Sequence, residues 1–354
     1  MTITERLDRF QRRHPAAGFP LAVVYKFFDD DGYYLAALLT YYSFLALFPL
    51  LLLASTVLGF VLAGNPELQQ QLLNSALGEL PVIGPQLGRP DQLGGGVTGL
   101  VIGSLVALYG ASNAGQALQY AVNTAWSVPR HRRPDPIRSR IRSLALLCTL
   151  GLLVLGTTVL ATFGSGLARG SGIGIGVQIL LTLAAVLINA AVFILGFRLS
   201  TARPLTVRQV APGAIAAAVA WQLLQTFGGF YIERVVAQAG SVNAVFALVL
   251  GLLAFLYLAA YVLVLCVEID VVRVDRLYPR ALLTPFTDDV DLTRGDERVY
   301  TDAAQAQQAK GFQRVDVRFE DNVAAPDDVA APDDAAAEMP PAAGRSDTGG
   351  QPRA

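Results

Sequence analysis

Four polar side chains recur within one apolar segment at spacings of three, four and three residues: Asn113, Gln116, Tyr120 and Asn123. A helix places residues at this spacing on one face. A polar face on an otherwise apolar helix could line a path for a polar or charged substrate. It could also supply hydrogen bonds between helices, which are ordinary in membrane proteins. The residues alone leave both interpretations open.

Charged residues that could hold an anionic substrate follow the same segment. Asp135-Pro136 has the composition of a helix start, after which Arg138 and Arg142 share one helix face. Two arginines on one face could hold the phosphate of a lipid head group. Glu268, at the end of the last apolar run, could pair with an arginine or belong to an ion or substrate route, and we favour pairing. No apolar run carries a charge at its centre, which argues against a proton relay across a membrane.

Groups for catalysis or metal binding are sparse. The run Asp29-Asp30-Asp31 could ligate Mg²⁺, but its carboxylates do not share one helix face, so a solvated helix start is the more typical interpretation. His14 and His131 lie in separate segments and form no zinc-ligand pattern. The chain has no Walker, G-x-S-x-G or H-E-x-x-H motif. We therefore expect no catalytic residues, no metal, no cofactor and no enzymatic activity.

The elements that position these residues follow from composition. The 354 residues are 53% hydrophobic and only 16% charged, whereas a soluble domain has about 25% charged residues. This balance argues against a soluble enzyme. A helix of roughly 20 apolar residues crosses about 30 Å of hydrocarbon. Six such runs are present: Leu35–Ala63, Val97–Leu118, Leu144–Phe163, Val177–Phe197, Ala211–Phe230 and Val245–Val267. We predict an all-α membrane protein with six transmembrane helices.

Small residues recur at every fourth position of the second run. Such a ladder lets another helix approach closely, and van der Waals packing then drives association in lipid. The positions are Gly99, Gly103, Ala107, Ala111 and Gly115. We predict that they form a helix-packing face.

The basic residues predict an orientation. If the N-terminus lies inside, the inside segments that precede the last apolar run carry 14 Lys or Arg residues, and the outside segments carry 3. This split follows the positive-inside rule. Six spans then return the C-terminus to the same side. We predict a multi-pass protein of the bacterial cytoplasmic (inner) membrane with both termini in the cytoplasm.

The chain divides by composition into three parts. Residues 1–33 begin with an amphipathic pattern, with Ile3, Leu7 and Phe10 on one face, and we expect a cytoplasmic segment. Residues 34–276 form the predicted six-helix transmembrane domain. Residues 277–354 carry 8 basic and 15 acidic residues and contain the sequence VAAPDD twice. Because such a composition buries little apolar surface, we expect a cytoplasmic, mostly disordered acidic tail.

Several short motifs resemble the YihY/virulence factor BrkB family of bacterial inner-membrane proteins. They are Ala36–Ser43 with Leu47–Leu50, Tyr109–Ser112 with Ala121–Trp126, and Gly240-Ser241 with the ending Leu265–Glu268. Cys266 and Val267 depart from the Gly-Ala that often precedes this glutamate in the family. The resemblance implies six spans and a role in envelope integrity, with lipid movement as one suggestion. It supplies no catalytic residues, and the family's former name, ribonuclease BN, is regarded as an error.

Two functional hypotheses follow. The first is a non-enzymatic protein that supports the cell envelope by translocating an anionic lipid or a lipid-linked substrate past Asn113, Gln116, Tyr120, Asn123, Arg138, Arg142 and Glu268. The alternative is a non-transporting structural or assembly protein whose tail recruits partners. We expect membrane lipids as partners, with further copies of the chain or envelope-assembly proteins also able to bind, and no nucleic acid. A ribonuclease is rejected, because no clustered ligands could activate water toward a phosphodiester.

Overall fold

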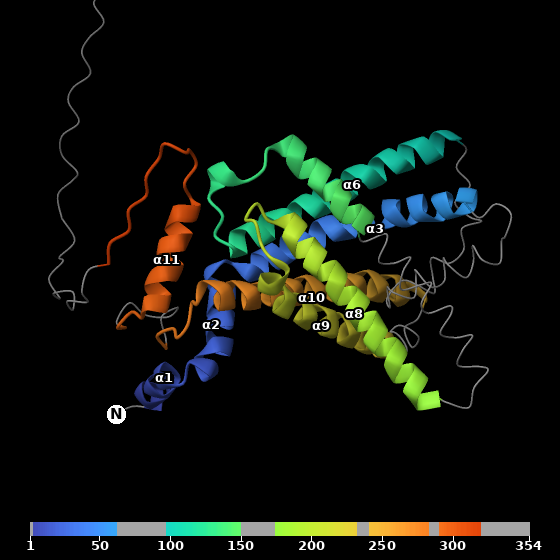
Figure 1. The fold of residues 1–354 in the computed structure, drawn as a ribbon. Coiled ribbons are helices and arrows are strands. Elements are labelled where there is room, and N and C mark those ends of the chain that lie inside the picture. Colours follow the sequence, from blue (N-terminus) through green and yellow to red (C-terminus); the bar gives the residue numbers. More distant parts are fainter. Residues whose placement is uncertain (1–2, 62–96, 150–173, 232–240, 283–289, 320–354) are drawn as a thin grey trace, which may run out of the picture. The chain divides into compact units, whose positions relative to one another are not determined.

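The computed structural model describes residues 3–61, 97–149, 174–231, 241–282 and 290–319. Within these ranges every regular element is a helix (Figure 1). In chain order they are α1 Ile3–Arg13, α2 Pro15–Asp29, α3 Gly32–Val61, α6 Val97–Ala125, a 3-10 turn at Arg130–Arg132, a helix over residues 136–149, α8 Gly174–Ser200, α9 Val207–Tyr231, α10 Ser241–Asp275 and α11 Arg294–Ala306. The all-α prediction is confirmed for this part of the chain.

Five of the predicted spans coincide with long helices: α3, α6, α8, α9 and α10. Leu144–Phe163 begins in the helix over residues 136–149, and the rest of it lies outside the described residues. By length and hydropathy, Thr182–Ser200 and Val249–Asp275 could each cross a membrane, and Gly32–Leu47 is a shorter apolar helix. These helices fit a membrane protein, and the number and orientation of the spans stay predictions.

The long helices pack around α10. Helix α10 contacts α2, α3, α6 and α9, while α3 runs alongside α6 and α8 alongside α9 (Figure 1). The main apolar core includes Val122, Phe197, Val210 and Val267, contributed by four different helices. Large apolar side chains such as Leu183 and Leu187 on α8 are exposed, which suits contact with lipid.

Two glycines of α6 mark close helix approaches. An added Cβ atom at Gly110 would lie 3.2 Å from the Cα atom of Ala46 on α3. At Gly115 it would lie 2.7 Å from the Cβ atom of Ser143, which belongs to the next helix. Ala111 is buried. Gly99, Gly103 and Ala107 lie in α6, and their packing stays a prediction.

The segment after residue 276 differs from the expected disordered tail. Residues up to Arg318 belong to the same compact unit as the helices. Leu277 and Val299 join the apolar core, and Thr293 and Asp296 form a capping box that starts α11. The acidic composition of this segment did not reveal that Leu277 and Val299 are core residues. Residues 320–354, which hold the repeated VAAPDD sequence, lie outside the described residues.

Candidate functional site

The arginine-bearing connections meet at one end of the helices. Arg142 Nη1 donates to the carbonyl of Thr201 at 3.3 Å, and Arg203 pairs with Asp275 through two hydrogen bonds of 2.8 Å. The N–H of His131 donates to the carbonyl of Gln308, 3.2 Å away. Contacts of this kind join residues 130–142, 198–208 and 275–308. These are segments that the positive-inside pattern assigns to one side.

Asn123 lies at the centre of this end, with 2% of its surface exposed. Its Nδ2 donates to the carbonyl of Gln119 at 2.6 Å and to that of Ser200 at 3.1 Å. Its Oδ1 accepts from the N–H of Ala202 at 2.8 Å and from Thr201 Oγ1 at 3.4 Å. The amide therefore uses both donors and both lone pairs to hold the connection between α8 and α9.

Gln119 makes the corresponding link to the helix over residues 136–149. Its Nε2 donates to Ser139 O and Ser143 Oγ, both at 2.9 Å, and its Oε1 accepts from Ser139 Oγ at 3.2 Å. Gln119 was not among the predicted site residues, although it lies four residues after Gly115 and so shares the helix face of the small-residue ladder. We call Gln119, Asn123, Ser139, Ser143 and Thr201 the amide junction.

The other members of the polar stripe have different surroundings. Asn113 and Gln116 are half-buried, and Gln116 Nε2 donates to Ser112 O of its own helix at 3.3 Å. Tyr120 is exposed, and the Arg133 guanidinium stacks 5.3 Å from its ring centre. Thr201 thus brings Asn123 and Arg142 together, whereas Tyr120 and Glu268 lie in other environments.

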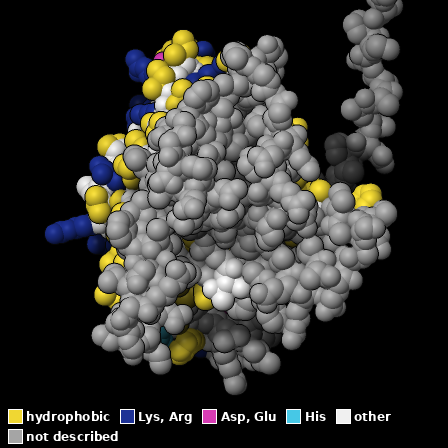
Figure 2. Space-filling model, turned by 90° about the vertical axis from the view of Figure 1, so that its right-hand side faces the viewer, with side chains coloured by type: hydrophobic (Ala, Val, Ile, Leu, Met, Phe, Trp, Pro, Cys, Tyr) yellow, Lys and Arg dark blue, Asp and Glu magenta, His cyan; other side chains and the backbone are white. Residues whose placement is uncertain are grey.

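The helix over residues 136–149 carries basic and apolar groups at its surface. Arg138 is 79% exposed and lies 3.9 Å from Asp135. Ile137, Ile141 and Leu144, at helical spacing, are also exposed. Figure 2 shows Lys and Arg side chains standing among hydrophobic ones along one edge of the described surface. Such a surface suits the boundary between lipid head groups and tails.

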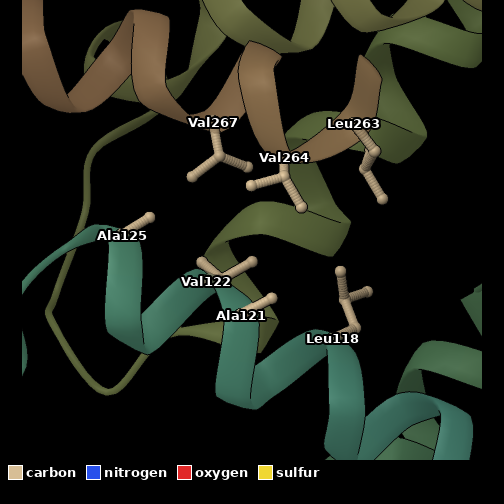
Figure 3. Close-up of a pocket in the computed structure, with 7 residues that line it drawn as sticks. All are labelled: Leu118, Ala121, Val122, Ala125, Leu263, Val264 and Val267. Atoms are coloured by element: carbon tan, nitrogen blue, oxygen red, sulfur yellow. The ribbon is translucent and has the colours of Figure 1, made fainter. Parts of the chain in front are cut away.

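A small cavity separates α6 from α10. Its volume is about 10 Å³, close to the minimum that holds one water molecule. Every lining side chain is apolar, with Leu118, Ala121, Val122 and Ala125 facing Leu263, Val264 and Val267 (Figure 3). An apolar space of this size holds no polar substrate.

A second set of polar residues, all charged, joins α2, α10 and α11. Lys26 on α2 is 1% exposed, forms an ion pair with Asp30 and donates to the carbonyl of Ala125 at 3.3 Å. Burial alone would lower the pKa of Lys26, but the negative charges of Asp30 and Glu268 outweigh it, so the pKa is raised. The ammonium group is therefore held in its charged form.

Glu268 on α10 faces Lys26 and Asp30 rather than the arginine that the sequence analysis favoured. Its side chain is fully buried. Among the residues that the structure describes, no N–H or O–H group donates to either of its carboxylate oxygens. Such a side chain is expensive to bury as an anion.

Arg280 fastens the C-terminal segment to the N-terminal helices. Its fully buried guanidinium pairs with Asp29 at 2.9 Å and, through Nε, with Asp296 on α11. The rings of Tyr25 and Tyr300 lie 6.0 and 5.7 Å from it. Asp296 also accepts from the N–H groups of Ala281 and Thr293, at 2.9 Å each. Asp296 therefore accepts from Arg280 and from two backbone N–H groups.

The interpretation of Asp29-Asp30-Asp31 as a solvated helix start is wrong for its first two residues. Asp29 is bound by Arg280 and Asp30 by Lys26, with 13% and 6% of their side chains exposed. Burial raises the pKa of Asp30 above its ordinary value, although Lys26 acts in the opposite direction. We call Lys26, Asp29, Asp30, Glu268, Arg280 and Asp296 the charge cluster.

Comparison with known proteins identifies the family. A family model described as virulence factor BrkB matches residues 23–286, which is most of the chain. The chain belongs to the virulence factor BrkB family. The matched residues include Lys26, Asp30, Glu268 and Arg280, whereas Asp296 lies beyond them.

One curated relative of this BrkB family member is a ribonuclease-like protein, YfkH, of Bacillus subtilis (strain 168). The two chains are 26% identical over 255 residues, which cover 68% of this chain and 89% of that protein. No solved structure matches the chain. Family membership and the apolar helices together assign a membrane protein of the BrkB family.

Proposed function

We propose that this BrkB family protein crosses the bacterial cytoplasmic membrane six times, with both termini inside, and supports the cell envelope by moving an anionic lipid or a lipid-linked substrate between leaflets. The gathering of the arginine-bearing connections at one end of the helices supports the topology. Segments that share one end of a bundle are separated by an even number of crossings. The excess of arginine at that end supports its proposed location in the cytoplasm.

The proposal that the substrate is a lipid depends on the surface of the helix over residues 136–149. Arg138 extends beside the exposed side chains of Ile137 and Ile141. An arginine in this position can bind a phosphate while the neighbouring side chains contact acyl chains. The Tyr120–Arg133 pair offers a second contact for a head group. Since Asn123 has no free hydrogen-bonding capacity, the route runs along the surface past Gln116 and Tyr120.

A transfer assay tests this proposal. Purified protein is reconstituted into liposomes that contain a fluorescent anionic phospholipid, and the rate of its movement between leaflets is measured. We expect Arg138→Ala to slow transfer several-fold, because an exposed cation at the entry is lost. Arg208→Ala removes an exposed arginine from the first turn of α9 and should leave the rate unchanged. No transfer by the wild-type protein would remove the transport proposal.

The small apolar cavity between α6 and α10 favours a second candidate, a non-transporting structural or assembly protein whose tail recruits partners. Deleting residues 320–354 separates the two candidates, since it retains α11 and the charge cluster. A transporter should still restore the envelope of a strain that lacks the gene. Loss of this rescue with lipid transfer intact would favour the assembly role.

We also propose that the protein is not an enzyme and binds no nucleic acid. Incubation of purified protein with labelled RNA should leave the RNA intact. Cleavage that disappears in the Asp30→Asn or His131→Ala variant would contradict this.

A further inference from the structure

Glu268 carries a buried carboxylate whose oxygens receive no donor from the described residues. Its exposed fraction is zero, and its charged neighbours come from residues 26–30. Lys26 and Asp29 face it from α2, and Asp30 faces it from the turn between α2 and α3. An ionised carboxylate in such a place needs either a cation or a proton to compensate it.

The two cations of the charge cluster do not fully compensate the Glu268 carboxylate. Arg280 serves Asp29 and Asp296, and backbone N–H groups stabilise Asp296 further. Lys26 is then left with both Asp30 and Glu268, and its ion pair is with Asp30. Two adjacent buried carboxylates beside one ammonium group cannot both ionise without a large cost. A single proton between them supplies the missing hydrogen bond and balances the charge.

We propose that Glu268 and Asp30 together bind one proton, which makes this part of the charge cluster a proton-binding site at the end of α10. The proton resides on a carboxyl oxygen of one residue and is donated to the carboxylate of the other. The raised pKa of Asp30, caused first by burial, agrees with this arrangement. The site does not depend on the proposed lipid transport.

A proton fits this site better than a metal ion. The ammonium group of Lys26 is already bound to Asp30, so a metal cation would lie beside a like charge. The residues that the structure describes contain no group of three or more His, Cys, Asp or Glu side chains suited to a metal. A proton needs only two carboxyl oxygens in contact.

Loss of the proton should lower the free energy of unfolding. Two negative charges would then face each other across the contact between the α2–α3 turn and α10. The folded protein binds a proton that the unfolded chain has already released at the same pH. Its stability therefore falls as pH rises from the ordinary carboxyl pKa through the raised one. The Glu268→Gln variant keeps a neutral side chain of the same shape and should lose this pH dependence.

Infrared spectroscopy of the purified full-length protein in detergent tests the proposal. We expect the carbonyl stretch of a protonated carboxyl group in the wild type at neutral pH, and its loss as pH rises. Glu268→Gln and Asp30→Asn should each abolish this signal, while Glu268→Gln, which leaves the Lys26–Asp30 pair intact, retains the melting temperature at neutral pH. Asp135→Asn removes an exposed carboxylate, 76% of whose side chain is accessible, and should leave the signal intact.

Several results would overturn the proposal. They are a wild-type protein without the protonated carboxyl signal, a signal that survives in both cluster variants, and a melting temperature with the same pH dependence in wild type and Glu268→Gln. Stabilisation of the wild type by Na⁺, without a protonated carboxyl group, would assign the site to a metal cation instead.

Discussion

The amide junction and the charge cluster do similar mechanical work with different chemistry. Each joins elements that are far apart in the chain, at the same end of the helices. In the amide junction, Asn123 and Gln119 are neutral, and their donors and acceptors are matched by carbonyl, hydroxyl and N–H groups. In the charge cluster, two cations serve four carboxylates, and Glu268 has no donor among the described residues.

The difference shows which region can respond to its surroundings. A satisfied amide keeps one arrangement across the whole range of pH, because it neither gains nor loses charge. A buried carboxylate changes its charge when it binds or releases a proton, and the helices that hold it must then adjust. We infer that the amide junction sets geometry and that the charge cluster is the responsive element.

Arg280→Met should produce the largest loss of stability. It removes the cation between Asp29 and Asp296 and leaves two carboxylates partly or fully buried. Breaking a buried ion pair from one side costs about 3–5 kcal/mol. Reversible unfolding in mixed micelles measures this loss, and hydrogen exchange should show α11 losing protection first. Arg138→Ala removes an equal charge from an exposed pair and should cost no more than about 1 kcal/mol. Equal effects of the two variants would break the distinction between buried and exposed charges.

Asn123→Leu should have the next largest effect. The substitution leaves the N–H of Ala202 and the carbonyl of Ser200 without their partner in a buried place. An unsatisfied buried polar group costs about 1–3 kcal/mol. Asn113→Leu, on the half-buried side of the stripe, is the matched control and should cost less. The loss of stability for Asn123→Leu should be the same at acidic and alkaline pH. A strong pH dependence would show that this region also senses charge.

Gly115→Ala should have the smallest effect of the three. The added Cβ atom would meet Ser143 of the amide junction at 2.7 Å, so the two helices must separate slightly. Overpacking of this kind costs about 1–3 kcal/mol. Gly196→Ala on α8 is the control, because nothing lies within 4 Å of its Cβ position. That variant should gain up to about 1 kcal/mol from helix propensity. Thermal melting of both proteins measures the contrast, and destabilisation of both would remove steric contact as the explanation.

The sequence by itself determined the helices and the distribution of basic residues. Apolar runs and helical spacing are local properties, so they predict α3, α6, α8, α9 and α10 without knowledge of their neighbours. The arginines between the runs likewise mark which connections belong together. Family membership followed from short motifs such as Tyr109–Ser112, and the comparison confirms it.

Only the tertiary structure decided which polar residues meet. Asn123 and Gln119 look alike in the sequence, and their roles depend on Ser200 and Ser139, which other segments supply. Asp29 and Arg280 are 251 residues apart, and no local pattern links them. Charged groups find partners through the packing of whole helices, because burial makes an unpaired charge costly wherever it lies in the chain. Leu277 and Val299 could not be identified as core residues from the acidic sequence around them, because they are buried only against helices that lie elsewhere in the chain.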